Sequence, residues 1–180
     1  RFAKSMNIFL PDFKFADPSL ARTCMGDERY PDLALASIVR MAAERGFLTP
    51  WDPSGERPAQ EGLLVRHLVL PGHVQNSLDV LSRLHRELGP RLPVSIMSQY
   101  HPMPRCRERG LLDRPVARAE YEAVCHAAEE LGFVHVFIQQ GPADTAFLPD
   151  FERDEPFHGN RERPRENHGQ KGRRAELQKP

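Results

Sequence analysis

The chain has 180 residues, of which 39% are hydrophobic, and its 25 basic and 25 acidic side chains give a formal net charge of zero. This length predicts one ordinary domain or a part of a larger one. The charge balance argues against a nucleic-acid partner, because such proteins usually carry a basic surface. No apolar run approaches the roughly 18 residues of a membrane-spanning helix, and no signal peptide is recognisable, so we expect no membrane partner. Three scattered cysteines predict a reducing, cytoplasmic location.

Short apolar runs with the composition of β-strands alternate with segments that have the apolar spacing of amphipathic helices. Strands alternating with helices predict a parallel sheet with helices over its outer face. A complete eight-stranded barrel needs about 250 residues, so the fold class that we predict is α/β with a parallel sheet, and any (β/α) barrel would be present only in part. In chain order, we expect a strand over 6–15, a helix over 31–44, a turn within 47–62, a strand over 63–70, a helix over 77–88 with Ser77 as its N-cap, a strand over 94–100, a helix over about 121–131 and a strand over 133–138.

The composition changes near residue 151. Residues 152–180 are mostly charged or polar and include only three apolar side chains, Phe157, Ala175 and Leu177. Such a segment buries too little apolar surface to offset the entropy lost on ordering. We therefore expect a folded region over 1–151 and a charged, disordered tail over 152–180.

Alternation along the first strand separates its polar side chains from its aromatic ones. Phe13 and Phe15 share one face and are expected to pack under helices, whereas Asp12 and Lys14 point to the opposite face. Both polar residues lie near the carboxyl end of the strand, where ligands bind in barrels and in open parallel sheets. The sequence therefore predicts a ligand site that includes Asp12 and Lys14.

The later strands add further polar side chains. Arg66 and His67 point to opposite faces of the second strand, and alternation does not decide which of them faces the helices. A consistent arrangement gathers five residues near one end of the sheet: Asp12, Lys14, Arg66, Gln99 and His101. Unpaired buried charges cost several kcal/mol. The cluster must therefore be paired internally, hydrated or occupied by a charged ligand, and ordinary satisfied charges at strand ends remain the alternative.

Several strings of the sequence resemble a known family: NIFLPDFKFAD at 7–17, RHLVLPG at 66–72, MSQY at 97–100, FLPDF at 147–151 and EPF at 155–157. In this order and spacing they resemble radical S-adenosylmethionine (radical SAM) proteins. The nearest group is the iron–sulfur proteins related to pyruvate formate-lyase activating enzyme. The resemblance covers about residues 3–157 and implies the second half of a partial TIM-type barrel of six β/α units.

The resemblance also implies an iron–sulfur cluster, but this chain lacks the family's Cys-x3-Cys-x2-Cys motif. Cys24, Cys106 and Cys125 do not have that spacing, and the three thiolates that ligate such a cluster must lie close together. Cys24 and Cys106 are expected in loops, and Cys125 on the apolar stripe of a helix. We therefore expect the cluster ligands in a missing N-terminal half, no metal site in this chain, and no activity from this chain alone.

In proteins of this kind, a reduced [4Fe–4S] cluster cleaves S-adenosylmethionine to methionine and a 5′-deoxyadenosyl radical, which abstracts hydrogen from a substrate. The resemblance implies two partners, a glycyl radical enzyme and a flavodoxin-type or ferredoxin-type reductant. It also implies roles for the cluster residues. Lys14 would bind the methionine carboxylate, and Asp12 the ammonium, directly or through a cation. Arg66 would face the cofactor, and Gln99 and His101 would lie near the adenosine.

Two other functions stay open. A metal-dependent barrel hydrolase would need histidines from different strands, namely His67, His73, His101 or His135, but the sequence has no His-x-His or His-Glu-x-x-His pair. Lys14 beside such a site would also repel a cation. A non-catalytic half-barrel remnant or interaction module would expose the edge of its first strand, and we would then expect dimerisation or aggregation.

Overall fold

The computed structural model describes residues 6–52, 54 and 56–138. The chain divides into two units, Arg1–Ala143 and Asp144–Pro180, and all described residues belong to the first. The tail expected at 152–180 and the strings at 147–157 lie outside the described residues. No helix in the described part is long and apolar enough to cross a membrane.

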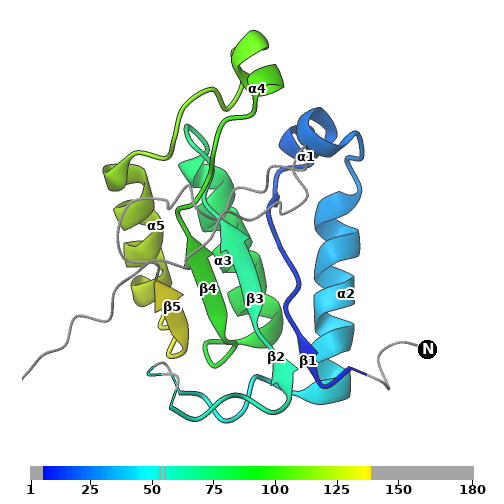
Figure 1. Ribbon diagram of the computed structural model, residues 1–180. Helices are drawn as coiled ribbons and strands as arrows, with labels where there is room; N and C mark the ends of the chain where they lie inside the picture. The colour runs from blue at the N-terminus through cyan, green and yellow to red at the C-terminus, as the bar shows by residue number, and fades with distance from the viewer. Residues whose placement is uncertain (1–5, 53, 55, 139–180) are drawn as a thin grey trace, which may run out of the picture. The chain divides into compact units, whose positions relative to one another are not determined.

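The long helices α2, α3 and α5 alternate with strands along the described chain, as the sequence predicts, and the short helices α1 and α4 are additional (Figure 1). All pairs among the described strands are parallel, so the coarse prediction of an α/β fold with a parallel sheet is confirmed. The described strands do not close into a barrel. In chain order the elements are β1 (Ile8–Phe9), α1 (Pro18–Met25), α2 (Tyr30–Arg45), β2 (Gly62–Leu63), β3 (Val65–Leu68), α3 (Val74–Leu88), β4 (Val94–Met97), α4 (Pro104–Glu108), α5 (Arg118–Glu130) and β5 (Val136–Ile138).

The two small sheets, β1–β2 and β3–β4–β5, join through the extended run from β2 to β3. The amide of Leu64 donates to Phe9 on one side of this run, and the amide of Val65 donates to Pro93 on the other. A parallel bridge between Asp12 and Arg66 carries the first pairing past Pro11, which has no N–H to donate. The run over 62–68 therefore lies between the first strand and β4.

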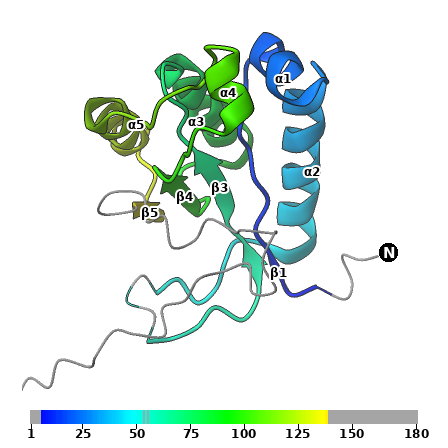
Figure 2. The ribbon, with the colours of Figure 1, turned by 45° about the horizontal axis from the view of Figure 1, so that its top comes forward.

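The long helices α2, α3 and α5 lie on one side of the strands (Figure 2). Phe13 is fully buried and Phe15 is 5% exposed, which confirms that both aromatic side chains pack in the interior. His67 is also fully buried, so it faces the helices and Arg66 points to the other face. We call the face toward the helices, which carries His67, the covered face, and the face that carries Arg66 the open face of the sheet. Fully buried side chains of the main core include Phe13, Leu63, Val65, Val69, Val80, Leu81, Leu84, Leu92, Val94, Ile96 and Val124.

Helix α3 begins three residues earlier than the sequence predicts. The turn at Gly72, with φ of +77°, is closed by a hydrogen bond from the amide of His73 to Leu70, and the helix follows at once. Ser77 is therefore buried inside the helix, and its prediction as the N-cap is wrong. An N-cap residue has an extended backbone. Ser77 cannot adopt one, because the helix already begins directly after the tight turn.

Helix α1 has no clear apolar pattern in the sequence, because only Leu20 and Ala21 of its eight residues are buried, and it is not among the predicted elements. Its ends carry clear signals instead. Asp17 caps the first turn by accepting from the amide of Ser19, Pro18 occupies the first helical position, and Gly26 ends the helix in a left-handed conformation. The prediction that Cys24 and Cys106 lie in loops is also wrong, since they belong to α1 and α4.

Candidate functional site

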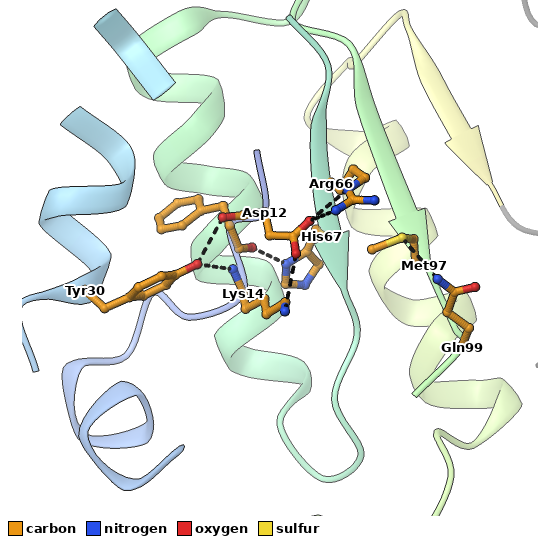
Figure 3. Close-up of polar contacts among 8 residues, drawn as sticks. Asp12, Lys14, Tyr30, Arg66, His67, Met97 and Gln99 are labelled. Carbon is orange, nitrogen blue, oxygen red and sulfur yellow. Dashed lines mark hydrogen bonds and ion pairs between the residues drawn. The ribbon is translucent and has the colours of Figure 1, made fainter. Parts of the chain in front are cut away.

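Three charged side chains meet on the open face of the sheet (Figure 3). Asp12 Oδ1 accepts from Arg66 Nε at 2.8 Å and lies 2.8 Å from Arg66 Nη2, while Lys14 Nζ lies 3.3 Å from Asp12 Oδ2. We call these residues the Asp12 cluster. Their side chains are 29% (Asp12), 38% (Lys14) and 42% (Arg66) exposed, so solutes can reach them. Two cations against one carboxylate leave an excess positive charge, which suits a ligand with an anionic group.

Tyr30, at the start of α2, holds the backbone of the Asp12 cluster. Its hydroxyl donates to the carbonyl of Asp12 at 3.0 Å and accepts from the amide of Lys14 at 3.1 Å. Burial raises the pKa of the Tyr30 hydroxyl, which favours its protonated, donating form. The Tyr30 side chain thereby satisfies the carbonyl of Asp12 and the amide of Lys14 in the segment that follows β1.

Asn76, in the first turns of α3, holds the next part of the same segment. Its amide nitrogen donates to the carbonyl of Lys14 at 2.9 Å, and its Oδ1 accepts from the amides of Ala16 at 2.8 Å and Asp17 at 3.2 Å. The side chain is buried, and a buried amide needs such partners. Sequence reasoning missed both Tyr30 and Asn76, because alternation along a strand carries no signal for a partner on a distant helix.

His67 supports the same strand pair from the covered face. Its Nδ1 lies 2.8 Å from the carbonyl of Phe13, so Nδ1 carries the proton and donates, because a carbonyl can only accept. Burial lowers the pKa of His67 to about 4, and the ring is therefore neutral near pH 7. Its Nε2 has no hydrogen-bond partner in the described part of the chain. His67 therefore acts as a structural support and does not reach the open face.

Gln99 and His101 do not join the Asp12 cluster. Both follow the end of β4 at Met97 and lie in a loop, although the sequence predicts a strand up to residue 100. Gln99 is exposed, and its amide contacts the sulfur of Met97 at 3.7 Å, apart from Asp12 and Lys14 (Figure 3). His101 is half-buried. Among the described residues, no hydrogen bond or ion pair links either side chain to the cluster.

An aromatic group continues the open face away from the Asp12 cluster. Arg66 pairs in register with Ser95, which pairs in turn with Phe137, so their side chains point to the same face. The ring of Trp51 lies 4.6 Å from that of Phe137 and 4.9 Å from that of His135, measured between centroids. Adjacent strands are about 4.8 Å apart, so a charged and an aromatic surface lie about two strand spacings apart. The sequence analysis predicts only a turn around Trp51.

The described residues contain no group of three or more His, Cys, Asp or Glu side chains that could hold a metal ion. His67 faces the helices, whereas His135 packs against Trp51, so they do not form the histidine set that a hydrolase would need. Cys125 lies on α5 and packs against the main core, whereas Cys24 lies on α1 and Cys106 on α4. These residues therefore do not fit an iron–sulfur cluster.

Fold and site together define an α/β protein whose parallel sheet carries a charged, solvent-accessible group on its open face. Comparisons of the chain with models of known families, with curated proteins and with solved structures found no match. The function therefore has to be argued from the sequence motifs and from the geometry of the Asp12 cluster.

Proposed function

We propose that the chain is the C-terminal half of a radical SAM barrel and that the Asp12 cluster binds the amino-acid end of S-adenosylmethionine. The observation that carries the proposal is the contact of Asp12 with both Lys14 and Arg66. All three residues belong to the strings at 7–17 and 66–72 on which the resemblance rests. Asp12 and Lys14 belong to the segment that follows β1 and Arg66 belongs to β3, yet all three meet on one accessible face.

The charges of the Asp12 cluster suit a zwitterion. The ligand's carboxylate can replace Asp12 as the partner of Lys14 or Arg66, while Asp12 accepts hydrogen bonds from the ligand's ammonium group. The guanidinium of Arg66 can hold a carboxylate through two parallel hydrogen bonds. Gln99 and His101, in the loop after β4, are proposed to approach the adenosine. Phe137 and Trp51 offer apolar surface on the same face.

A reduced [4Fe–4S] cluster would supply the electron that cleaves the bound S-adenosylmethionine and yields a hydrogen-abstracting radical. The described residues do not fit the cluster, so we place its ligands in a preceding segment of a longer protein, an oxidoreductase acting in the cytoplasm. This chain's own part is to bind and orient the methionine end. A glycyl radical enzyme and a flavodoxin-type or ferredoxin-type reductant are the proposed partners. By itself, the chain is expected to bind the ligand weakly and to catalyse nothing.

Amide chemical shifts of the full 180-residue chain test the ligand site, because they detect weak binding residue by residue. We expect S-adenosylmethionine and free methionine to shift the amides of Asp12, Lys14 and Arg66 with a Kd on the order of 1 mM. We expect 5′-methylthioadenosine, which lacks the amino-acid group, to leave these amides unshifted. Lys14→Met and Arg66→Met should each weaken binding about tenfold, the effect of losing about 1.4 kcal/mol.

Arg118→Met is the matched control, because Arg118 pairs with Glu122 on the surface of α5. It should leave methionine binding unchanged. Equal losses in Arg118→Met and Lys14→Met, or no shift around Asp12 with S-adenosylmethionine, would show that the site is wrong. The longer protein has its own test: a reading frame without a Cys-x3-Cys-x2-Cys motif upstream would exclude the proposed cluster.

A non-catalytic interaction module is the second candidate, and the outer edge of β1 favours it. Among the described residues, β1 pairs with β2 on one side and with no strand on the other. Unpaired strand edges are templates for pairing with another chain. If the Asp12 cluster binds no amino-acid ligand while the chain associates through this edge, the module is the better explanation.

A further inference from the structure

Two of the three cysteines lie on neighbouring helices at the carboxyl end of the sheet. Cys24 belongs to α1 and Cys106 to α4, and both views show these helices next to each other (Figures 1 and 2). A small apolar cluster joins the two regions, because Leu20 and Ala21 of α1 share it with Tyr100 and Leu112, which flank α4. Cys24 therefore lies one helical turn after Leu20 and Ala21, the residues of α1 that belong to this apolar cluster.

Hydrogen bonds hold Cys106 within a closed loop. The hydroxyl of Tyr100 donates to the carbonyl of Leu112 at 2.8 Å, and the amide of Leu111 donates to the carbonyl of Cys106 at 3.0 Å. The loop from Tyr100 to Leu112 is thereby fixed at both ends beside α1.

The pKa shifts of Cys24 and Tyr100 have causes in common with this arrangement. Burial and the nearby Cys106 raise the pKa of the Cys24 thiol. The pKa of Tyr100 is raised by burial, by a side-chain hydrogen bond with Cys106 and by the charge of Cys24. These shifts agree with the neighbouring positions of α1 and α4 (Figures 1 and 2). The pKa of Cys125 is raised by burial and by carboxylates of its own helix, and neither of the other cysteines contributes.

We propose that Cys24 and Cys106 are a modification site, a thiol pair that forms a reversible intramolecular disulfide with a small disulfide such as oxidised glutathione as the oxidant. The thiolate of the exposed Cys24 attacks one sulfur of glutathione disulfide, forming a mixed disulfide and releasing one glutathione thiolate. The thiolate of Cys106 then attacks the Cys24 sulfur, which forms the Cys24–Cys106 bond and releases the second glutathione. Two protein thiols are oxidised and one glutathione disulfide is reduced.

This bond would link the segments that follow β1 and β4. Asp17, the N-cap of α1, lies three residues after Lys14. Helix α4 follows the loop that contains Gln99 and His101. The disulfide would therefore restrain both segments at the carboxyl end of the sheet. Because the raised pKa keeps Cys24 protonated near neutral pH, exchange should accelerate as the pH rises above 7. The pair does not depend on the proposed function.

Peptide mapping of the full chain tests the pair directly. The protein is equilibrated with glutathione buffers of increasing disulfide content, quenched with acid, alkylated, digested and analysed by mass spectrometry. We expect a Cys24–Cys106 cross-linked peptide in the monomer, with Cys125 still free to be alkylated. Cys24→Ser and Cys106→Ser should each abolish the intramolecular bond, and Cys125→Ser, the matched control, should leave its yield unchanged.

The same mapping in urea shows whether the fold selects the pair. In the unfolded chain, disulfides that include Cys125 should also appear, so the preference for Cys24–Cys106 should be lost. The proposal is overturned if native and unfolded chains give the same pattern. It is equally overturned if the native chain yields only stable glutathione adducts, bonds to Cys125 or disulfide-linked dimers.

Discussion

Arg66 and His67 join the same two strand segments from opposite faces. Arg66 bonds to the side chain of Asp12 on the open face, and His67 bonds to the carbonyl of Phe13 on the covered face. The first contact stays accessible to solutes, whereas the second is fully buried. Arg66 thus belongs to the candidate binding site, whereas the adjacent His67 supports the structure. The charge state of His67 follows from its burial.

Acid should destabilise the protein through His67 before its carboxylates titrate. The pKa of His67 is about 4 in the folded chain and about 6.5 in the unfolded chain. The unfolded state therefore binds the proton first, and the free energy of unfolding falls as the pH decreases from about 6.5 towards 4. The full effect is about 3 kcal/mol. Urea unfolding followed by circular dichroism at pH 7.5, 6.5, 5.5 and 5 measures this slope.

His67→Gln separates the hydrogen bond from the titration, because the glutamine amide can donate to Phe13 without changing charge. Its unfolding free energy should depend less on pH between 6.5 and 5 than that of the wild type. His126→Gln, at an exposed position of α5, is the control and should keep the wild-type slope. Equal slopes in His67→Gln and the wild type would contradict the assignment.

At the scale of elements, β2 lies between two segments that approach it closely. The amide of Gly62 donates to Asn7 on the β1 side, and Leu63 donates to Gly46 on the other side. Gly62 has φ of +111°, and an added Cβ would collide with the carbonyl of Phe47. Only glycine therefore allows the segment after α2 and the first strand to flank the same short strand.

Gly62→Ala should cost more stability than the same change at another glycine with a positive φ. Gly89 has φ of +77°, but a Cβ added there would meet no atom within 4 Å among the described residues. We expect Gly89→Ala to lower the free energy of unfolding by about 1 to 2 kcal/mol, from backbone strain alone. Gly62→Ala adds a steric clash and should lower it by about 3 to 5 kcal/mol. Urea unfolding measures both, and equal losses would show that the segment at Phe47 can move aside.

At the scale of the whole described unit, the sheet has one covered face, and the segment from β1 to Pro11 forms an unpaired edge. Phe9 and Pro11 accept hydrogen bonds from Leu64 and Arg66, so Leu10 between them directs its N–H and C=O away from the sheet. The side chain of Leu10 is itself 50% exposed. An apolar, unpaired edge of this kind favours association with a further strand.

The chain should therefore self-associate as its concentration rises, and Leu10→Pro should suppress this. Proline removes the outward N–H of the edge, which has no partner among the described residues, and leaves the inward bonds of Phe9 and Pro11 in place. Sedimentation velocity over a range of concentrations measures the effect. Leu33→Lys, at a 56% exposed position of α2, is the control. Lysine is used there because proline would disrupt the helix. An entirely monomeric wild type, or equal suppression by both variants, would contradict association through this edge.

Much of the fold could be predicted because its signals are local. Alternation placed Phe13 in the interior and Asp12 on the opposite face, and the apolar spacing of α5 located its helix. Alternation could not orient the second strand, since each of its faces carries one polar residue. The N-cap preference of serine also gave the wrong start for α3 at Ser77, because the helix begins directly after the tight turn that follows β3.

Local sequence patterns were enough to predict the alternation of the strands with the long helices α2, α3 and α5, the face that Asp12 shares with Lys14, and the motifs behind the proposed function. The tertiary structure was needed to show that Asp12 meets Arg66, that Gln99 stays apart, that Trp51 packs on Phe137, and that the helices of Cys24 and Cys106 are neighbours. The physical reason is the separation in sequence between the residues that interact. Periodicity depends on a few neighbouring residues, whereas these contacts depend on strand register and helix packing between segments far apart in the chain.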